Sequence, residues 1–260
     1  MTSEAVTLDR ALFLLTGGEA GERFHRVLGD LVDAGLRRAT LLYVLEGAPA
    51  DDPFLEEVGM WARRFEAAGL DDVAVALKRG DAGAWVRELS AMTPGQWVIA
   101  ATPRVTPEGF LRPASSWRNL RVPVLLVPPG ETGRRAPLFE RAVVGLKDPE
   151  RLHAEVADLR RGLPGVRDWR GLHVRTDTTP PAPDSGYPIP VATLQGDRYD
   201  IADNLLAAAH DGAGLLVLFA RPEGIEPDLP VGYVVEAVAR GTEVPLLLWP
   251  GKPEPGGEPR

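Results

Sequence analysis

Residues 96–128 read QWVIAATPRVTPEGFLRPASSWRNLRVPVLLVP, and this stretch decides the predicted fold. Two continuous apolar runs, Trp97–Thr102 and Val122–Val127, flank a loop rich in Pro, Arg and Gly. Apolar runs of this length are typical of strands buried on both faces of a parallel sheet. In such a sheet, the loop and helix start that follow a strand are the usual place for a nucleotide's phosphates. The stretch therefore predicts strand, loop, short helix and strand around a candidate ligand site.

The sequence before this stretch alternates between short apolar runs and helical periodicity. The apolar runs 12–15, 40–45 and 73–77 are separated by segments whose apolar residues recur at three- and four-residue steps. Helix ends are expected at Gly35 and Gly69, and Asp81 is expected to cap a third helix. This alternation predicts an α/β fold with a parallel sheet covered by helices on both faces.

The same pattern starts again, more weakly, after a linker rich in Pro, Gly and Arg at residues 128–135. Arg141-Ala142 corresponds to Arg10-Ala11, and Gly196-Asp197 corresponds to Gly80-Asp81. The second copy is shorter between these points by about 15 residues, roughly one helix. We therefore predict two tandem domains, residues 10–129 and a shortened copy at 139–250.

Composition limits the classes of function. The chain has 260 residues, a net charge of −8 and no cysteine. An acidic chain is a poor candidate for binding nucleic acid by charge, and no apolar run is long enough to span a membrane. The lack of cysteine excludes disulfides, thiolate metal sites and a cysteine nucleophile, and it fits a reducing compartment. We expect a cytoplasmic protein that binds neither nucleic acid nor a membrane.

The order and spacing of Gly80-Asp81, the apolar run 97–101 and the run Val122–Val127 resemble those of a tandem universal stress protein. The resemblance implies two five-stranded parallel α/β domains of the adenine-nucleotide-hydrolase-like, Rossmann-like type. It also implies that the domains pair through their closing strands, Val122–Val127 with Val244–Trp249, as an intramolecular pseudo-dimer. Both a monomer and a homodimer of the whole chain are compatible with that pairing.

Many members of that family bind ATP with glycines after the fourth strand, in the pattern Gly, two residues, Gly, nine residues, Gly-Ser/Thr. Those positions hold Ala101, Arg104 and Ala114 here, followed by Ser115, so all three glycines are missing. Glycines allow backbone amides to approach the phosphates closely, which a Cβ atom hinders. The resemblance therefore predicts the fold and argues against the family's usual ATP site.

The remaining anion-binding candidates lie at two turns. The family's acidic residue at the end of the first strand is replaced by Thr16-Gly17-Gly18. With Glu19, this turn could hold an anion at a helix start or could simply form a strand-to-helix turn with a capping box. The loop after the fourth strand offers Arg104, Arg112, Ser115 and Ser116, either as an anion pocket or as a solvated loop with a capped helix.

Three functional hypotheses remain open from the sequence. The leading one is a non-enzymatic stress-response or regulatory protein that lost standard ATP binding and acts on an unknown protein partner or small ligand. The second is an ATP-binding protein or slow ATPase that uses Thr16–Glu19, Arg104 and Ser115 in place of the glycines. The third is a structural module whose contacts are a tryptophan-rich surface and the polar segment 176–190. No nucleophile–base pair is recognisable, and the four histidines are scattered, so neither catalytic nor metal residues are expected.

Overall fold

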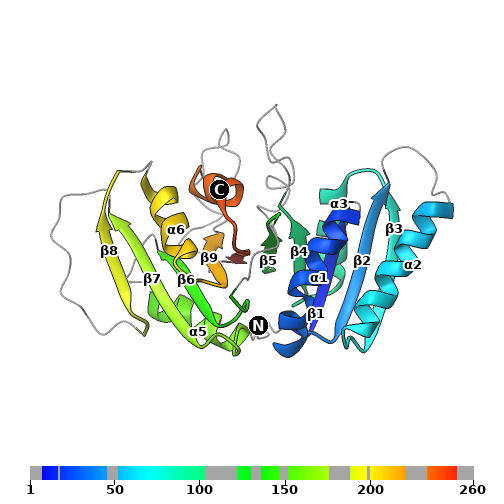
Figure 1. The fold of residues 1–260 in the computed structure, drawn as a ribbon, viewed down its shortest axis with the longest axis horizontal. Helices are drawn as coiled ribbons and strands as arrows, with labels where there is room; N and C mark the ends of the chain where they lie inside the picture. The colour runs from blue at the N-terminus through cyan, green and yellow to red at the C-terminus, as the bar shows by residue number, and fades with distance from the viewer. Residues whose placement is uncertain are drawn as a thin grey trace.

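The fold is a single ten-stranded sheet with helices on both faces (Figure 1). The computed structural model describes residues 8–16, 18–45, 52–102, 122–129, 136–146, 152–175, 188–197, 200–220 and 233–250. The strands are β1 Arg10–Leu15, β2 Arg38–Leu45, β3 Asp72–Arg79, β4 Trp97–Ala101, β5 Val124–Val127, β6 Arg141–Leu146, β7 Asp168–Arg175, β8 Val191–Gln195, β9 Leu215–Ala220 and β10 Leu246–Pro250. The described helices are α1 Gly18–Asp33, α2 Asp52–Ala67, α3 Ala82–Met92, α5 Leu152–Gly162, α6 Asp200–His210 and α7 Tyr233–Gly241.

The strand order is symmetric about the middle of the sheet. It runs β3-β2-β1-β4-β5-β10-β9-β6-β7-β8. Counted outward from the centre, β10, β9, β6, β7 and β8 of the second half occupy the same places as β5, β4, β1, β2 and β3 of the first. At the centre, β5 and β10 pair antiparallel, with Leu125 opposite Leu247, whereas the other strand pairs of the described sheet are parallel. The predicted pairing of the two closing strands is therefore confirmed, and so is the α/β class.

Helices cover both faces of the sheet, as the alternating sequence pattern predicts. On one face, buried residues of α1, α2 and α5 belong to a single apolar cluster that extends through both halves. On the other face, α3, α6 and α7 pack on a second cluster. The sheet is therefore buried on both sides, which explains why its inner strands read as continuous apolar runs.

Several helix boundaries follow from the predicted signals. Gly35 and Gly69 come just after α1 and α2 with φ values of 114° and 102°, the left-handed conformation that ends a helix. Asp81 caps α3, since its side chain accepts a hydrogen bond of 2.6 Å from the backbone N–H of Ala84. These three predictions are confirmed.

The second half lacks a counterpart of α2 among the described residues between β7 and β8. Residues 176–187, which fall in this interval, lie outside the described part of the chain. The sheet face that α2 covers in the first half bears Tyr43 and Val73, whereas the corresponding face of β7 and β8 carries the more exposed His173 and Thr193. Polar side chains on a more solvated face are consistent with the shortened second copy that the sequence predicts.

The two halves share their core. Trp97 on β4 and Trp249 on β10 are both buried, and their rings meet edge to face with centroids 6.0 Å apart. Trp61 and Trp169 are buried as well. The hypothesis of a tryptophan-rich contact surface is therefore wrong for these four residues, because their indoles fill the interior. The domain boundaries at 129 and 139 stay a prediction.

Candidate functional site

The sheet topology has a switch point in the first half, at the carboxyl ends of β1 and β4, which is where a crevice is expected in this kind of fold. From β1 the order continues through β2 and β3 on one side and through β4 and β5 on the other, so β1 and β4 flank a switch point. In open α/β sheets, ligands bind outside the carboxyl ends of the strands at such a point. Leu14 lies opposite Ala100 in this pair, which brings Thr16 and Ala101 to the same edge of the sheet.

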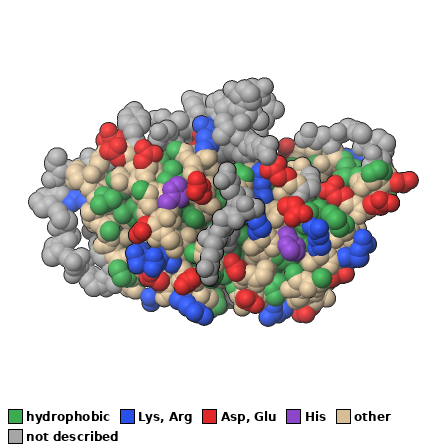
Figure 2. Space-filling model, viewed as in Figure 1, with side chains coloured by type: hydrophobic (Ala, Val, Ile, Leu, Met, Phe, Trp, Pro, Cys, Tyr) green, Lys and Arg blue, Asp and Glu red, His purple; other side chains and the backbone are tan. Residues whose placement is uncertain are grey.

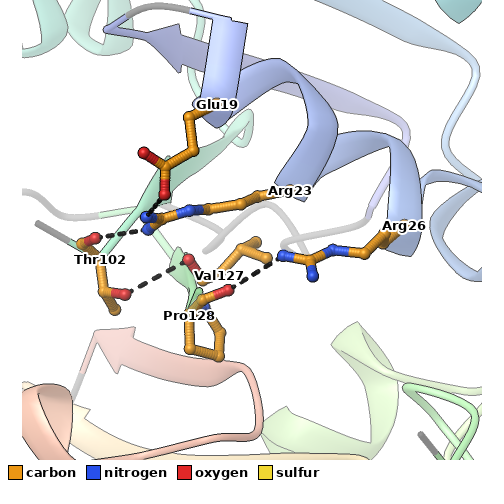
Figure 3. Close-up of polar contacts among 6 residues, drawn as sticks. All are labelled: Glu19, Arg23, Arg26, Thr102, Val127 and Pro128. Carbon is orange, nitrogen blue, oxygen red and sulfur yellow. Dashed lines mark hydrogen bonds and ion pairs between the residues drawn. The ribbon is translucent and has the colours of Figure 1, made fainter. Parts of the chain in front are cut away.

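A buried arginine from α1 lies at this edge (Figure 3). The Nη1 of Arg23 donates a hydrogen bond of 2.8 Å to the backbone carbonyl of Thr102, the residue directly after β4. Its Nη2 pairs with the Oε1 of Glu19, one helical turn earlier, at 2.5 Å. The side chain of Arg23 is only 6% exposed, whereas that of Glu19 is 53% exposed. The crevice therefore carries an internal ion pair whose cation is buried and whose anion reaches solvent.

Thr102 is held in place from the opposite side by β5. Its backbone N–H donates to the carbonyl of Val127 at 2.9 Å, and its side-chain hydroxyl lies 3.4 Å from the same oxygen. Thr102 is itself 2% exposed. Because the peptide is fixed by β5, its carbonyl presents a rigid acceptor to Arg23 rather than one that adjusts to it.

The same helix also holds both ends of the segment that joins the two halves. Arg26 reaches the carbonyl of Pro128 at 3.5 Å (Figure 3), and the Oδ2 of Asp30 accepts a hydrogen bond of 2.8 Å from the backbone N–H of Leu138. Pro128 follows β5 directly and Leu138 precedes β6. Helix α1 thus connects the crevice to the junction of the halves.

The structure places some of the predicted site residues and leaves others outside the described residues. Thr16 is exposed just after β1, Gly18 opens α1, and Ala101 ends β4 with its side chain packed against the apolar core. These three lie at the same edge of the sheet. The remaining candidates, Gly17, Arg104, Arg112, Ala114, Ser115 and Ser116, lie outside the described residues.

Sequence reasoning missed Arg23 and a second buried charge, Glu155 on α5. Among the described residues, these two are the charged side chains of the core, 5% and 7% exposed. They occupy equivalent helix positions, because each directly precedes the first of three buried residues with identical spacing: Phe24, Val27 and Leu31 on α1, and Val156, Leu159 and Leu163 at α5. The sequence contains a signal for both residues, because each is a charged residue within the apolar stripe of a helix. A charged side chain in such a position is rarely buried without a partner.

The nearest titratable group on β2 is not suited to act as a base. Burial raises the pKa of the Tyr43 hydroxyl well above its ordinary value, and the negative charge of Glu57 raises it further. Tyr43 therefore stays protonated at neutral pH. Among the described residues, no cluster of three or more His, Asp or Glu side chains is placed to hold a metal ion.

On the face in Figure 2, the described residues show no concentration of positive charge. Among the described residues, Lys and Arg side chains alternate there with Asp and Glu. This mixture agrees with the acidic balance of the sequence, which disfavours nucleic-acid binding by charge. No helix of the described chain is both long and apolar enough to cross a membrane.

Comparison with solved structures identifies the fold. A universal stress protein from Archaeoglobus fulgidus superposes with a TM-score of 0.66 at 15% identity, covering 94% of this chain and 97% of its own. A putative universal stress protein from Pseudomonas aeruginosa UCBPP-PA14 gives 0.64 at 13% identity, with 93% of each chain covered. A functionally unknown protein from Pseudomonas aeruginosa PAO1 gives 0.62 at 14% identity, with 93% and 92% covered.

Sequence comparisons give no such match: no family model matches the chain, and no curated protein does. At identities near 15% the structural likeness concerns the path of the chain and not its chemistry. It nevertheless extends over more than nine tenths of the chain, so it applies to both halves. The chain therefore has the universal-stress-protein fold.

Proposed function

We propose that this chain is a non-enzymatic stress-response or regulatory protein of the cytoplasm whose first half does not bind ATP in the manner usual for its fold. It acts by binding a protein partner or a small ligand. The observation that carries the proposal is the Arg23 side chain, which reaches from α1 to the carbonyl of Thr102, just after β4. A nucleotide that used this crevice would have to share it with the guanidinium and with Glu19.

The residue at the end of β4 supports the same conclusion. A phosphate cradle needs backbone N–H groups that approach the ligand without side chains between them. The first glycine of the family's pattern is Ala101 here, and its methyl group packs on the core beside the crevice. The end of β4 therefore lacks the first glycine of the usual ATP-binding pattern, which supports the proposal.

A thermal-shift series tests the proposal. A ligand with a Kd of about 10 µM, added at about 1 mM, stabilises the folded state by about 2.7 kcal/mol, which shifts the Tm of a chain of this size by about 5 to 10 °C. We expect no such shift with ATP, with or without Mg²⁺. A shift of that size with ATP would contradict the proposal, and hydrolysis of ATP by the pure protein would contradict its non-enzymatic part.

The alternative function is ATP binding through side chains, in which the buried guanidinium of Arg23 would itself act as a phosphate ligand. A phosphate could replace the carboxylate of Glu19 at Nη2, with Arg104 and Ser115 as further ligands. In that case ATP should bind, and the variants Arg104→Ala and Ser115→Ala should each weaken binding. Unchanged affinity in both variants would exclude this alternative.

A further inference from the structure

Strand β3 forms one end of the ten-stranded sheet. Its neighbour in the described sheet is β2, whereas the edge that β5 would expose is already paired with β10. The outer side of β3 therefore presents N–H and C=O groups that no strand of the described sheet pairs. Natural proteins usually protect such an edge with charged residues or proline in the strand, or by keeping the strand short.

The middle of β3 has none of these protections. The strand has eight residues, and Val73–Leu77 reads Val-Ala-Val-Ala-Leu without charge or proline. Val75 and Leu77 are 40% and 41% exposed, which places them among the few large apolar side chains on the described surface. The charges lie at the two ends, with Asp72 at the start and Lys78 and Arg79 at the close.

This pattern is complementary to itself. If two β3 strands lie antiparallel with Val75 on a two-fold axis, Val73 of each copy faces Leu77 of the other, and Val75 faces Val75. These residues share one face of the sheet, because side chains alternate along a strand. On the other face Ala74 meets Ala76, two small side chains that leave room for close approach. The apolar residues thus form a continuous cross-strand row.

The charges agree with the same register. Asp72 of one copy lies opposite Lys78 of the other, on the same face, so the pairing makes two cross-strand contacts of opposite charge. The ammonium of Lys78 already stands 4.3 Å from the centre of the Trp85 ring, which fixes it on this face. We propose that β3 pairs antiparallel with β3 of a second copy, so that two chains form a dimer through a continuous twenty-stranded sheet.

The opposite edge of the sheet does not have this pattern. Strand β8 has five residues, Val-Ala-Thr-Leu-Gln, with no charge of either sign. The side chain of Leu194 on β8 is 39% exposed, close to the value for Val75. However, β8 has no acidic residue at one end and basic residue at the other that would select a register for pairing with a second copy. Leu194 is therefore a matched control for Val75.

Sedimentation equilibrium of the full chain tests the dimer. We expect the wild type to have twice the mass of one chain. Val75→Lys places two like charges against each other on the axis, so this variant should be monomeric, whereas Leu194→Lys should remain dimeric. Circular dichroism should show both variants to be folded, since each replaced side chain is well exposed.

A charge exchange tests the register. Asp72→Lys should weaken the dimer at least tenfold, because Lys then faces Lys78, and adding Lys78→Asp to it should restore the dimer. The proposal is overturned if the wild type is monomeric at all concentrations, if Val75→Lys remains dimeric, or if Leu194→Lys dissociates. It is also overturned if the double exchange fails to restore association in a folded protein.

Discussion

At the scale of single residues, two arginines on α1 differ in their surroundings. Arg23 is buried and holds a carbonyl that strand pairing makes rigid, whereas Arg26 is exposed and reaches its carbonyl at 3.5 Å. Leaving a buried carbonyl without its donor costs free energy, and more of it is at stake at 2.8 Å than at 3.5 Å, the outer limit of a hydrogen bond. The same residue type therefore has two different structural roles within one turn of one helix.

Replacing each arginine by methionine measures this difference. Arg23→Met keeps the apolar stem but leaves the carbonyl of Thr102 without its donor, so we expect the free energy of unfolding to fall by about 1.5 to 3 kcal/mol. Arg26→Met should change it by less than about 0.5 kcal/mol. Urea denaturation at pH 7 measures both, and equal effects would mean that the contact with Thr102 contributes little.

Glu19 can be tested as an internal competitor for an anion. In Glu19→Ala the Nη2 of Arg23 loses its carboxylate, and a buried cation without a partner favours an external anion. We expect pyrophosphate to bind this variant at least tenfold more tightly than it binds the wild type, as measured by calorimetry. Glu22→Ala is the control, because Glu22 pairs with Arg64 instead. Equal affinities in the wild type and both variants would show that Glu19 does not block the crevice.

Only part of the site could be predicted at this scale. The substitution of Ala101 for glycine is visible in the sequence because a known pattern specifies the position. Arg23 has no such pattern, and its importance comes from Thr102, a residue 79 positions later that the fold brings to its guanidinium. Long-range contacts of this kind depend on the strand order, which a local reading of the chain does not supply.

At the scale of elements, α1 and α2 pack so closely that one residue must be glycine. A Cβ atom on Gly21 would lie 2.2 Å from the ring of Trp61, which is 1% exposed and cannot move into solvent. Gly29, two turns later on the same helix, has open space at the corresponding position. Substitutions at these two positions therefore distinguish two effects: close packing acts only at Gly21, whereas helix propensity acts at both.

Alanine at these two positions should have opposite effects. Gly29→Ala should stabilise the protein by about 0.5 to 1 kcal/mol, because alanine favours the helix and meets no neighbour. Gly21→Ala gains the same propensity but overpacks the core, so we expect a net loss of about 1 kcal/mol or more. Urea denaturation of both variants checks this, and stabilisation by Gly21→Ala would contradict the packing of Trp61 on α1.

Elements were the part of the structure that the sequence predicted best. The runs that became β4 and β5 are apolar because both faces of the sheet are covered, and Asp81 caps α3 through a local hydrogen bond. Such signals are encoded within a few residues. The course of the loop between β4 and β5 depends on residues 103–121, which lie outside the described residues, so the short helix expected there stays a prediction.

At the scale of the whole molecule, the two halves form one folding unit. One apolar cluster contains residues from β1 to β10, and the central pairing of β5 with β10 joins the sheets. Separation of the halves would expose Leu125, Leu247 and the edge-to-face indoles of Trp97 and Trp249. The cost of exposing this surface couples the stability of each half to the other.

We therefore expect a single cooperative unfolding transition. Urea curves followed by far-ultraviolet circular dichroism and by tryptophan fluorescence should coincide, because the indoles of Trp97 and Trp249 report on the junction. Two separated transitions, with the fluorescence change confined to one of them, would show instead that the halves unfold independently.

The proposed loss of the usual ATP site from the first half can be measured on the unmodified protein. Calorimetric titration of the wild type with ATP, with and without Mg²⁺, is the measurement. We predict no saturable heat at ATP concentrations up to about 1 mM, a range in which a micromolar site would saturate. Saturable binding with a Kd in the low micromolar range would contradict the account.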